Sequence, residues 1–336
     1  MNFGLVWCLQ EFYQGGSILF KTAVYIRTMF WSRKIRKHLE KNGFKKAIEK
    51  YPTICGRPLA NSNETSSRIA SAILEGAPYM IARFGNVELE NVGKCELAIN
   101  HRLQTSFDTL CNNAGFFPND ISQLPSFAKL MSDSMSFCDL QGVWYLPFED
   151  YYLKSGCLNP ELITEVRYLE PWFASEPWTK ALKGKKVLVI HPFDELIQEQ
   201  YAKRELLFSQ KNILPEFNLI TLKAVQTIAG SNDERFSTWF EALRYMCDEA
   251  DKIDFDVAII GCGAYGYPLA AHIKNSGKIA IHLGGVTQAL FGIKGKRWDV
   301  DPLDDTVRNL YNDNWVYPGE REKPRQFKQV ENGCYW

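Results

Sequence analysis

Apolar runs alternate with segments of helical spacing from about residue 65 to about residue 285. Uninterrupted apolar runs are typical of strands that are buried on both faces of a parallel sheet. Six segments have this pattern or a shorter version of it: YMIARF (79–84), GVWYLPF (142–148), KKVLVIHPF (185–193), FNLITLKA (217–224), FDVAIIGCG (255–263) and KIAIHLGG (278–285). We therefore predict an α/β protein, with a Rossmann-like, mostly parallel sheet flanked by helices.

Amphipathic segments between these strands predict the helices. Gly76 is the expected stop of the first, and Asn159 with Pro160 is the expected start of the second. The predicted helices are SSRIASAILEG (66–76), NPELITEVRYLEPW (159–172), DELIQEQYAKRELLFS (194–209), DERFSTWFEALRYMCDEADKI (233–253) and AYGYPLAAHIKNSG (264–277), and residues 94–140 are expected to be mainly helices and loops.

Residues 1–60 are predicted to form an N-terminal helical extension, and residues 61–336 the main domain. The first part of the extension is apolar and aromatic, and RKIRKHLEK (33–41) follows it. The window from Ser17 to Arg36 has too many charges to span a bilayer. We favour a packed helix with a solvated basic face. The alternative is an interfacial helix that makes weak peripheral contact with an anionic membrane.

Composition narrows the class of protein. The chain has 336 residues, 46% of them hydrophobic, which is the balance of a folded globular protein. Its 39 basic and 39 acidic residues provide no net charge for binding a nucleic acid, so no nucleic-acid partner is expected. The nine cysteines include no CxxC pair, which argues against a disulfide framework or a zinc site. A cytoplasmic location, with the inner face of the plasma membrane as the alternative, fits these thiols.

Polar and glycine-rich residues follow four of the predicted strands. In a parallel sheet, ligands bind outside the carboxyl ends of the strands. We therefore expect these residues to lie along one edge and to form a site. They are Gly85-Asn86, His191-Pro192-Phe193, Gly261-Cys262-Gly263 and His282-Leu283-Gly284-Gly285.

The segment GCGAYG (261–266) matches GxGxxG after a strand. A dinucleotide site also needs an acidic residue at the end of the next strand, where this chain has His282, so NAD or S-adenosylmethionine is the weaker reading. Glycines at such a turn let the backbone approach a phosphate, and we assign Gly261 and Gly263 to that role. The alternative is a tight strand-to-helix turn without a ligand.

The loop HLGGVTQALFGIKGKRW (282–298) is rich in glycine and polar residues. Lys294, Lys296 and Arg297 are candidates to neutralise phosphate, and Trp298 is a candidate to stack on a base. A structured surface loop with solvated charges explains the same residues equally well. His191 and His282 are candidate catalytic bases from their position after strands, against the commoner role of a hydrogen-bonded core histidine.

The turn ARFGNVELENV (82–92) resembles the RFG-D-x-E turn of bacterial glycosyltransferases with the GT-D fold. The segments VLVIHPFDELIQEQY (187–201), IIGCGAYGYPLAAHIKNSGKIAIHLGG (259–285) and TQALFGIKGKRW (287–298), and the ending VENGCYW (330–336), resemble GT-D-like proteins found with polysaccharide biosynthesis. The resemblance covers about residues 65–336.

This resemblance implies a nucleotide-sugar donor and a divalent cation, Mn²⁺ or Mg²⁺, near the turn. By position, Asn86 stands where the family has Asp, and Glu88 stands at the Glu. Arg83, Gly85, Asn86 and Glu88 are thus implied to bind donor phosphates. The resemblance also implies that Glu88 and Asn86 are the metal ligands, with metal binding weakened by the amide. The ordinary alternative for Asn86 is to cap the following helix.

Together these features predict a glycosyltransferase that transfers a sugar to a surface polysaccharide or a glycolipid. The acceptor is then a glycan or a lipid-linked glycan, and Glu88, His191 and His282 are the candidate catalytic residues. A non-catalytic nucleotide-sugar-binding or scaffold protein is the alternative from another class, and a Rossmann NAD or S-adenosylmethionine enzyme is a third.

Overall fold

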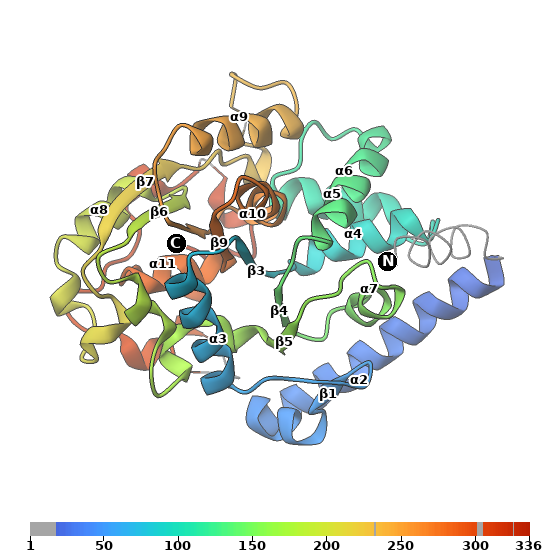
Figure 1. Cartoon of the computed structure of the whole chain (residues 1–336). Coiled ribbons are helices and arrows are strands. Elements are labelled where there is room, and N and C mark those ends of the chain that lie inside the picture. The colour runs from blue at the N-terminus through green and yellow to red at the C-terminus, as the bar shows by residue number, and fades with distance from the viewer. Residues whose placement is uncertain (1–17, 232, 301–304, 325) are drawn as a thin grey trace.

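The computed structural model describes residues 18–231, 233–300, 305–324 and 326–336 (Figure 1). Its centre is a seven-stranded sheet in the order β5-β4-β3-β9-β8-β6-β7, in which every pair is parallel. The strands are β3 (Tyr79–Arg83), β4 (Leu140–Val143), β5 (Leu162–Glu165), β6 (Lys186–His191), β7 (Asn218–Lys223), β8 (Val257–Ile260) and β9 (Ile279–His282). The predicted α/β class with a parallel sheet is confirmed.

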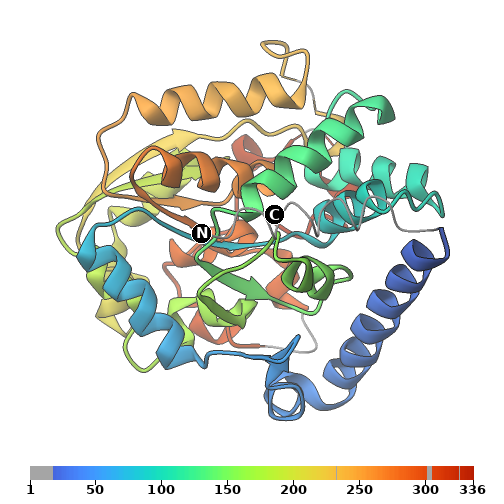
Figure 2. The same ribbon diagram turned by 45° about the vertical axis from the view of Figure 1, so that its right-hand side comes forward.

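Helices cover both faces of the sheet (Figures 1 and 2). One face packs against α4 (Asn86–Glu96), α5 (Leu103–Ala114), α6 (Leu124–Met135), α9 (Trp239–Asp251) and α10 (Gly266–Asn275). The other packs against α3 (Ser62–Glu75), α8 (Asp194–Tyr201) and α11 (Thr287–Leu290). In β6, Leu188 and Ile190 belong to the first core, and Val187 and Val189 belong to the second. Every position of such a strand is therefore apolar, because each fully buried side chain contributes about 1.5–3 kcal/mol.

The strand order creates a crossover between β6 and β8. From β6 the chain continues through α8 to β7, whereas from β8 it continues through α10 to β9 on the opposite side. The segments that leave these two neighbouring strands therefore diverge and open a crevice at their carboxyl ends. On the far side, β9 pairs with β3, with Tyr79 beside Ile279 and Ile81 beside Ile281.

The helix predicted over 159–172 is wrong. Residues Leu162–Glu165 form β5, the edge strand, in parallel register with Leu140–Val143, and short 3-10 turns follow. The β-branched pair Ile163 and Thr164 favours an extended backbone, and pairing with β4 overrides the helix-like start at Pro160.

The strand predicted over 142–148 lies earlier, at Leu140–Val143. The residues after it form a turn in which Tyr145 and Phe148 adopt φ of 61° and 76°. Helix α9 begins at Trp239 rather than at residue 233, because Thr238 and Glu241 form a capping box there. Helix α3 ends at Gly76 as predicted, with φ of 69°.

The N-terminal extension contains α2 (Ile18–Lys50), which is interrupted at Gly43. A short antiparallel hairpin follows, formed by the two-residue strands β1 (Thr53–Ile54) and β2 (Arg57–Pro58). Helix α2 lies at the periphery beside α7 (Glu149–Ser155) (Figures 1 and 2), and Arg27 pairs with Asp150 at 3.2 Å. Residues 1–17 of the predicted extension lie outside the described residues. In the described part, no helix combines the length and the apolar character that crossing a bilayer requires.

Candidate functional site

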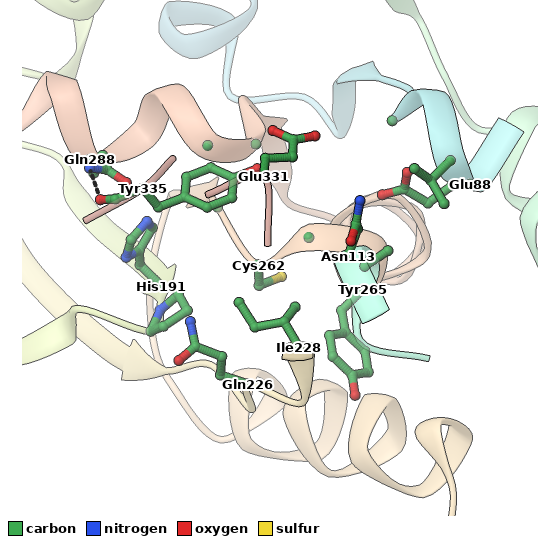
Figure 3. Close-up of a pocket in the computed structure, with 18 of the residues that line it drawn as sticks. Glu88, Asn113, His191, Gln226, Ile228, Cys262, Tyr265, Gln288, Glu331 and Tyr335 are labelled. Carbon is green, nitrogen blue, oxygen red and sulfur yellow. Dashed lines mark hydrogen bonds between the residues drawn. The ribbon is translucent and has the colours of Figure 1, made fainter. Parts of the chain in front are cut away.

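A cavity of about 180 Å³ opens at the carboxyl ends of the central strands (Figure 3). All four segments that the sequence placed at this edge contribute to its wall, from Gly85-Asn86 to Gly284-Gly285. The loop after β7 and the last residues of the chain complete it. The structure therefore brings together residues that are up to about 250 positions apart, from Arg83 to Trp336, at the crevice that the strand order creates.

Arg83, the last residue of β3, provides a positive charge in this wall. Its guanidinium lies over the Trp144 ring at 5.0 Å, and a Cβ at Gly284 would be 3.0 Å from its Cζ. The side chain of Arg83 forms no ion pair or hydrogen bond with any described residue. Burial lowers the pKa of the guanidinium, and the nearby Glu88 carboxylate only partly opposes this. A partly buried cation whose side-chain donors have no described partner indicates a site for an anion.

Glu88 lies in the first turn of α4 and is buried. Its carboxylate folds back over the N-cap residue Gly85, so a Cβ at that position would displace the carboxylate. Burial raises the pKa of the Glu88 carboxyl, and the charge of Arg83 acts in the opposite direction. No described residue forms an ion pair with it. Figure 3 shows Glu88 on the opposite side of the cavity from His191.

Asn86 also borders the cavity, but its side-chain oxygen accepts a hydrogen bond from Arg36 of α2 at 3.3 Å. The N-cap of α4 is Gly85, so the alternative that Asn86 caps this helix is wrong. Its hydrogen bond with Arg36 instead connects the turn after β3 to α2.

The two histidines are buried and neutral. Nδ1 of His191 accepts the backbone N–H of Phe193 at 3.0 Å, which leaves the ring proton on Nε2. Nδ1 of His282 lies 3.3 Å from the carbonyl oxygen of Ile260 and donates to it. Burial lowers the pKa of each to about 3, and for His282 the charge of Arg83 acts in the same direction. His191 is therefore suited to donate a hydrogen bond rather than to accept a proton.

The three glycines of the GCGAYG turn have different reasons to be glycine. A Cβ at Gly261 would lie 2.7 Å from both the His191 ring and Thr287, and one at Gly266 would overlap the His282 ring. Packing therefore requires these two. Gly263 has φ of 58°, and a Cβ there would have nothing closer than 3.7 Å. Of the three, Gly263 leaves open space for a ligand.

Residues near the end of the chain also line the cavity. Arg297 is one of the residues that the sequence predicted to neutralise phosphate, whereas Gln288, Glu331 and Tyr335 were not predicted. Arg297 stacks over the Tyr335 ring at 4.6 Å and pairs with Glu331 at 3.2 Å. The side-chain amide of Gln288 donates a hydrogen bond to the carbonyl oxygen of Tyr335 at 3.1 Å (Figure 3). The segment VENGCYW contains Glu331 and Tyr335, but the sequence assigned no role to either residue. Lys296 donates to the Asn332 carbonyl, and Trp298 packs in the core, so neither lines the cavity.

These residues provide a weak set of ligands for a metal ion. Within the described residues, no group of three His, Cys, Asp or Glu side chains is placed to hold one. At the turn after β3, Glu88 offers one carboxylate, and the oxygen of Asn86 already accepts from a cationic side chain. A divalent cation would therefore depend on phosphate oxygens of a bound substrate for most of its ligands. The predicted role of Mn²⁺ or Mg²⁺ stays a prediction.

No protein-family model matches this chain, and neither does any curated protein. Two solved structures are similar to it. One is described as "The highly conserved domain of unknown function 1792 has a distinct glycosyltransferase fold", with 11% identity, a TM-score of 0.40, and 78% of this chain and 96% of that chain covered.

The other is described as "Selenomethionine substituted structure of domain of unknown function 1792 (DUF1792)". It has 13% identity and a TM-score of 0.39, and the match covers 78% of this chain and 97% of that chain. At these values neither likeness assigns an activity, so the residues of the cavity must carry the functional proposal.

Proposed function

We propose that this protein is a glycosyltransferase that uses a nucleotide-sugar donor. The observation that carries the proposal is the partly buried guanidinium of Arg83, which has no ion pair among the described residues and lines the cavity at the β6–β8 crossover. A diphosphate provides the charge that this cation lacks, and the open space beside Gly263 lets a phosphate approach the backbone. The resemblance of the turn after β3 to a donor-binding turn supports a sugar as the group that the diphosphate carries.

In the proposed reaction, an acceptor hydroxyl attacks the anomeric carbon of the donor sugar. The bond from that carbon to the phosphate oxygen breaks, and a nucleoside diphosphate leaves. Arg83 stabilises the negative charge that develops on the leaving phosphate, and Arg297 lies in the same wall. A bound divalent cation would add charge stabilisation of the same kind.

The proton of the acceptor hydroxyl needs a base, and we assign this role to Glu88. Two carboxylates line the cavity, but Glu331 is paired with Arg297, whereas Glu88 has no ion pair among the described residues. A raised pKa makes Glu88 a better proton acceptor than an ordinary carboxylate. His191 donates through Nε2 and therefore orients a hydroxyl or a phosphate oxygen.

A thermal-shift screen tests the first part of the proposal. UDP, GDP, CDP, NAD and S-adenosylmethionine are each added with and without Mn²⁺. One nucleoside diphosphate should raise the melting temperature, because a ligand at 100 times its Kd stabilises the folded state by about 2.7 kcal/mol. Stabilisation by NAD or S-adenosylmethionine alone would contradict the proposal. The release of the same nucleoside diphosphate from its sugar conjugates then identifies the donor.

The second candidate is a protein that binds a nucleotide sugar without catalysis. It is favoured by one observation, the amide of Asn86 at the turn, where Arg36 engages it. The screen does not separate the two candidates, but turnover does. Binding without release of nucleoside diphosphate, tested with several acceptor glycans and a lipid-linked acceptor, would favour the binding protein.

A further inference from the structure

One face of α2 exposes large apolar side chains. Phe20, Ile26 and Phe30 have 42%, 60% and 70% of their surface exposed, and they belong to a short set of exposed large hydrophobic residues in the described chain. Ile26 and Phe30 are four positions apart, so they lie next to each other on the same face of the helix. We call Ile26, Phe30 and the basic residues Arg33, Lys34 and Lys37 the exposed stripe of α2.

The same helix concentrates positive charge. Residues 18–50 contain ten Lys or Arg and two Glu, a net charge of +8, although the whole chain has a net charge of zero. The rest of the chain is therefore net negative by the same amount. Arg33, Lys34 and Lys37 are exposed and form no ion pair with any described residue. Their charges are available to a partner.

The opposite face of α2 is packed against the protein. Ile35 is fully buried, Tyr25 stacks on Phe148 with a centroid distance of 6.0 Å, and Trp31 contacts Tyr145 edge-on at 5.8 Å. These contacts explain why the helix is held in place. They do not explain the exposed stripe, because it lies on the side that faces away from this core.

We propose that α2 docks the protein on an anionic lipid surface. Ile26 and Phe30 enter the boundary between headgroups and acyl chains, and Arg33, Lys34 and Lys37 lie among the headgroups. An apolar patch followed by basic residues on one helix face matches the chemistry of such an interface. Acidic residues are few on this helix, and Glu40 is the exposed one nearest to the stripe.

Charge also argues against a symmetric contact between the α2 helices of two copies. Such a contact would place +8 against +8, which is repulsive, whereas a bilayer with anionic lipids carries the complementary charge. Arg36 of the same helix donates to Asn86 at the cavity edge. If the proposed function holds, docking by α2 therefore places the cavity close to the surface that carries a lipid-linked acceptor.

Co-sedimentation of the full chain with vesicles tests the docking. Phosphatidylcholine vesicles with about 30% phosphatidylglycerol are compared with pure phosphatidylcholine, at low salt and at about 0.5 M salt, where surface charges are screened. One variant combines Ile26→Ser and Phe30→Ser, and a second combines Arg33→Gln, Lys34→Gln and Lys37→Gln. The matched controls are Leu74→Ser, at an exposed leucine of α3, and Lys129→Gln with Lys180→Gln, at exposed lysines elsewhere.

The parent should bind anionic vesicles and not neutral ones, and salt should weaken the binding. Each basic residue near an anionic membrane surface contributes about 1 kcal/mol to the free energy of binding. The triple variant should therefore bind the vesicles about a hundredfold more weakly. The apolar double variant should lose at least about tenfold from the lost burial, and the controls should bind like the parent. Unchanged far-ultraviolet circular dichroism and melting temperature confirm that the variants are folded.

Three results would overturn the proposal. The first is a parent that stays in the supernatant with anionic vesicles. The second is a loss that the charge variant shows and the apolar variant does not, since this indicates only non-specific attraction to polyanions. The third is a dimer in light scattering that Ile26→Ser with Phe30→Ser dissociates, which would make the exposed stripe a contact between copies. Because the assay needs no donor, its outcome is independent of the proposed function.

Discussion

Replacing Arg83 with Met separates a ligand-binding arginine from a structural one. Met keeps much of the length and the apolar contact with Trp144 but removes the charge. In the ligand-free protein, burial disfavours the charged guanidinium and no described carboxylate pairs with it. The Arg83→Met variant should therefore keep its free energy of unfolding or gain about 1 kcal/mol, as is common when a binding residue is removed.

Ligand affinity should change in the opposite direction. A hydrogen bond to a charged group is worth about 1.5–3 kcal/mol, so loss of the Arg83 contact should raise the Kd for the nucleoside diphosphate about 10- to 150-fold. Urea unfolding provides the first quantity and isothermal titration the second. The control is Arg68→Met. Arg68 lies over the Tyr79 ring at 4.4 Å but is already paired with Glu161 at 2.6 Å.

Arg68→Met should leave the Kd unchanged. The reasoning about Arg83 would be refuted by a Kd for Arg83→Met within about twofold of the parent, well below the smallest loss expected for a charged hydrogen bond. A loss of about 3 kcal/mol or more in the free energy of unfolding would show instead that Arg83 is a structural counter-ion, which compensates the buried charge of Glu88.

The remaining predictions concern the metal, the glycine turn and one buried acid. The role of Glu88 as a metal ligand competes with its role as the base, and isothermal titration separates the two. If Glu88 binds the cation, Glu88→Gln should abolish Mn²⁺-stimulated binding of the nucleoside diphosphate and Asn86→Asp should strengthen it, since one unit charge at contact is worth about 4 kcal/mol at an effective dielectric near 20. Equal binding by Glu88→Gln would exclude Glu88 as a ligand and leave it free to act as the base. Gly263→Val should weaken nucleotide binding, and Gly263→Asn, which tolerates the left-handed backbone, shows whether the loss comes from the filled space or from misfolding; parent-like binding by both variants would make the turn purely structural. Burial raises the pKa of Glu165 from 4.5 to about 8, so the stability it contributes is complete below pH 4.5 and is lost as the pH rises toward 8. Glu165→Gln should remove that loss between pH 5 and pH 8.5 in urea unfolding, and an unchanged pH dependence would contradict the assignment.

The strands at the centre of the sheet were predictable because their environment is uniform. In β6 and β8, every residue from Val187 to Ile190 and from Val257 to Ile260 is fully buried between helices, so the sequence is apolar without interruption. The edge strand β5 was not predictable in this way. It is largely buried, but two of its four residues, Thr164 and Glu165, are polar. The proline and asparagine before it suit a helix start equally well.

The candidate site was predictable where it follows strands and not where it depends on the tertiary fold. Arg83, His191, Gly261 and His282 directly end or follow strands of a parallel sheet, and one rule places them together. Glu331 and Tyr335 reach the cavity from a loop-rich segment that no periodicity describes. The pairing of Arg36 with Asn86 joins two elements 50 positions apart, and nothing local in either segment indicates it.

The pairing of β3 with β9 has a consequence for how the protein is made. During synthesis, β3 leaves the ribosome about 200 residues before its neighbour β9, so one of its edges has no native partner until most of the chain has been translated. Unpaired apolar strands are prone to aggregate, and contacts distant in sequence form slowly. Because Arg83 ends one of these strands and His282 the other, the cavity is assembled at the last stage of folding. If the cavity is assembled late, we expect the protein to depend on chaperones during expression. We also expect chains that stop before β9 to bind no ligand.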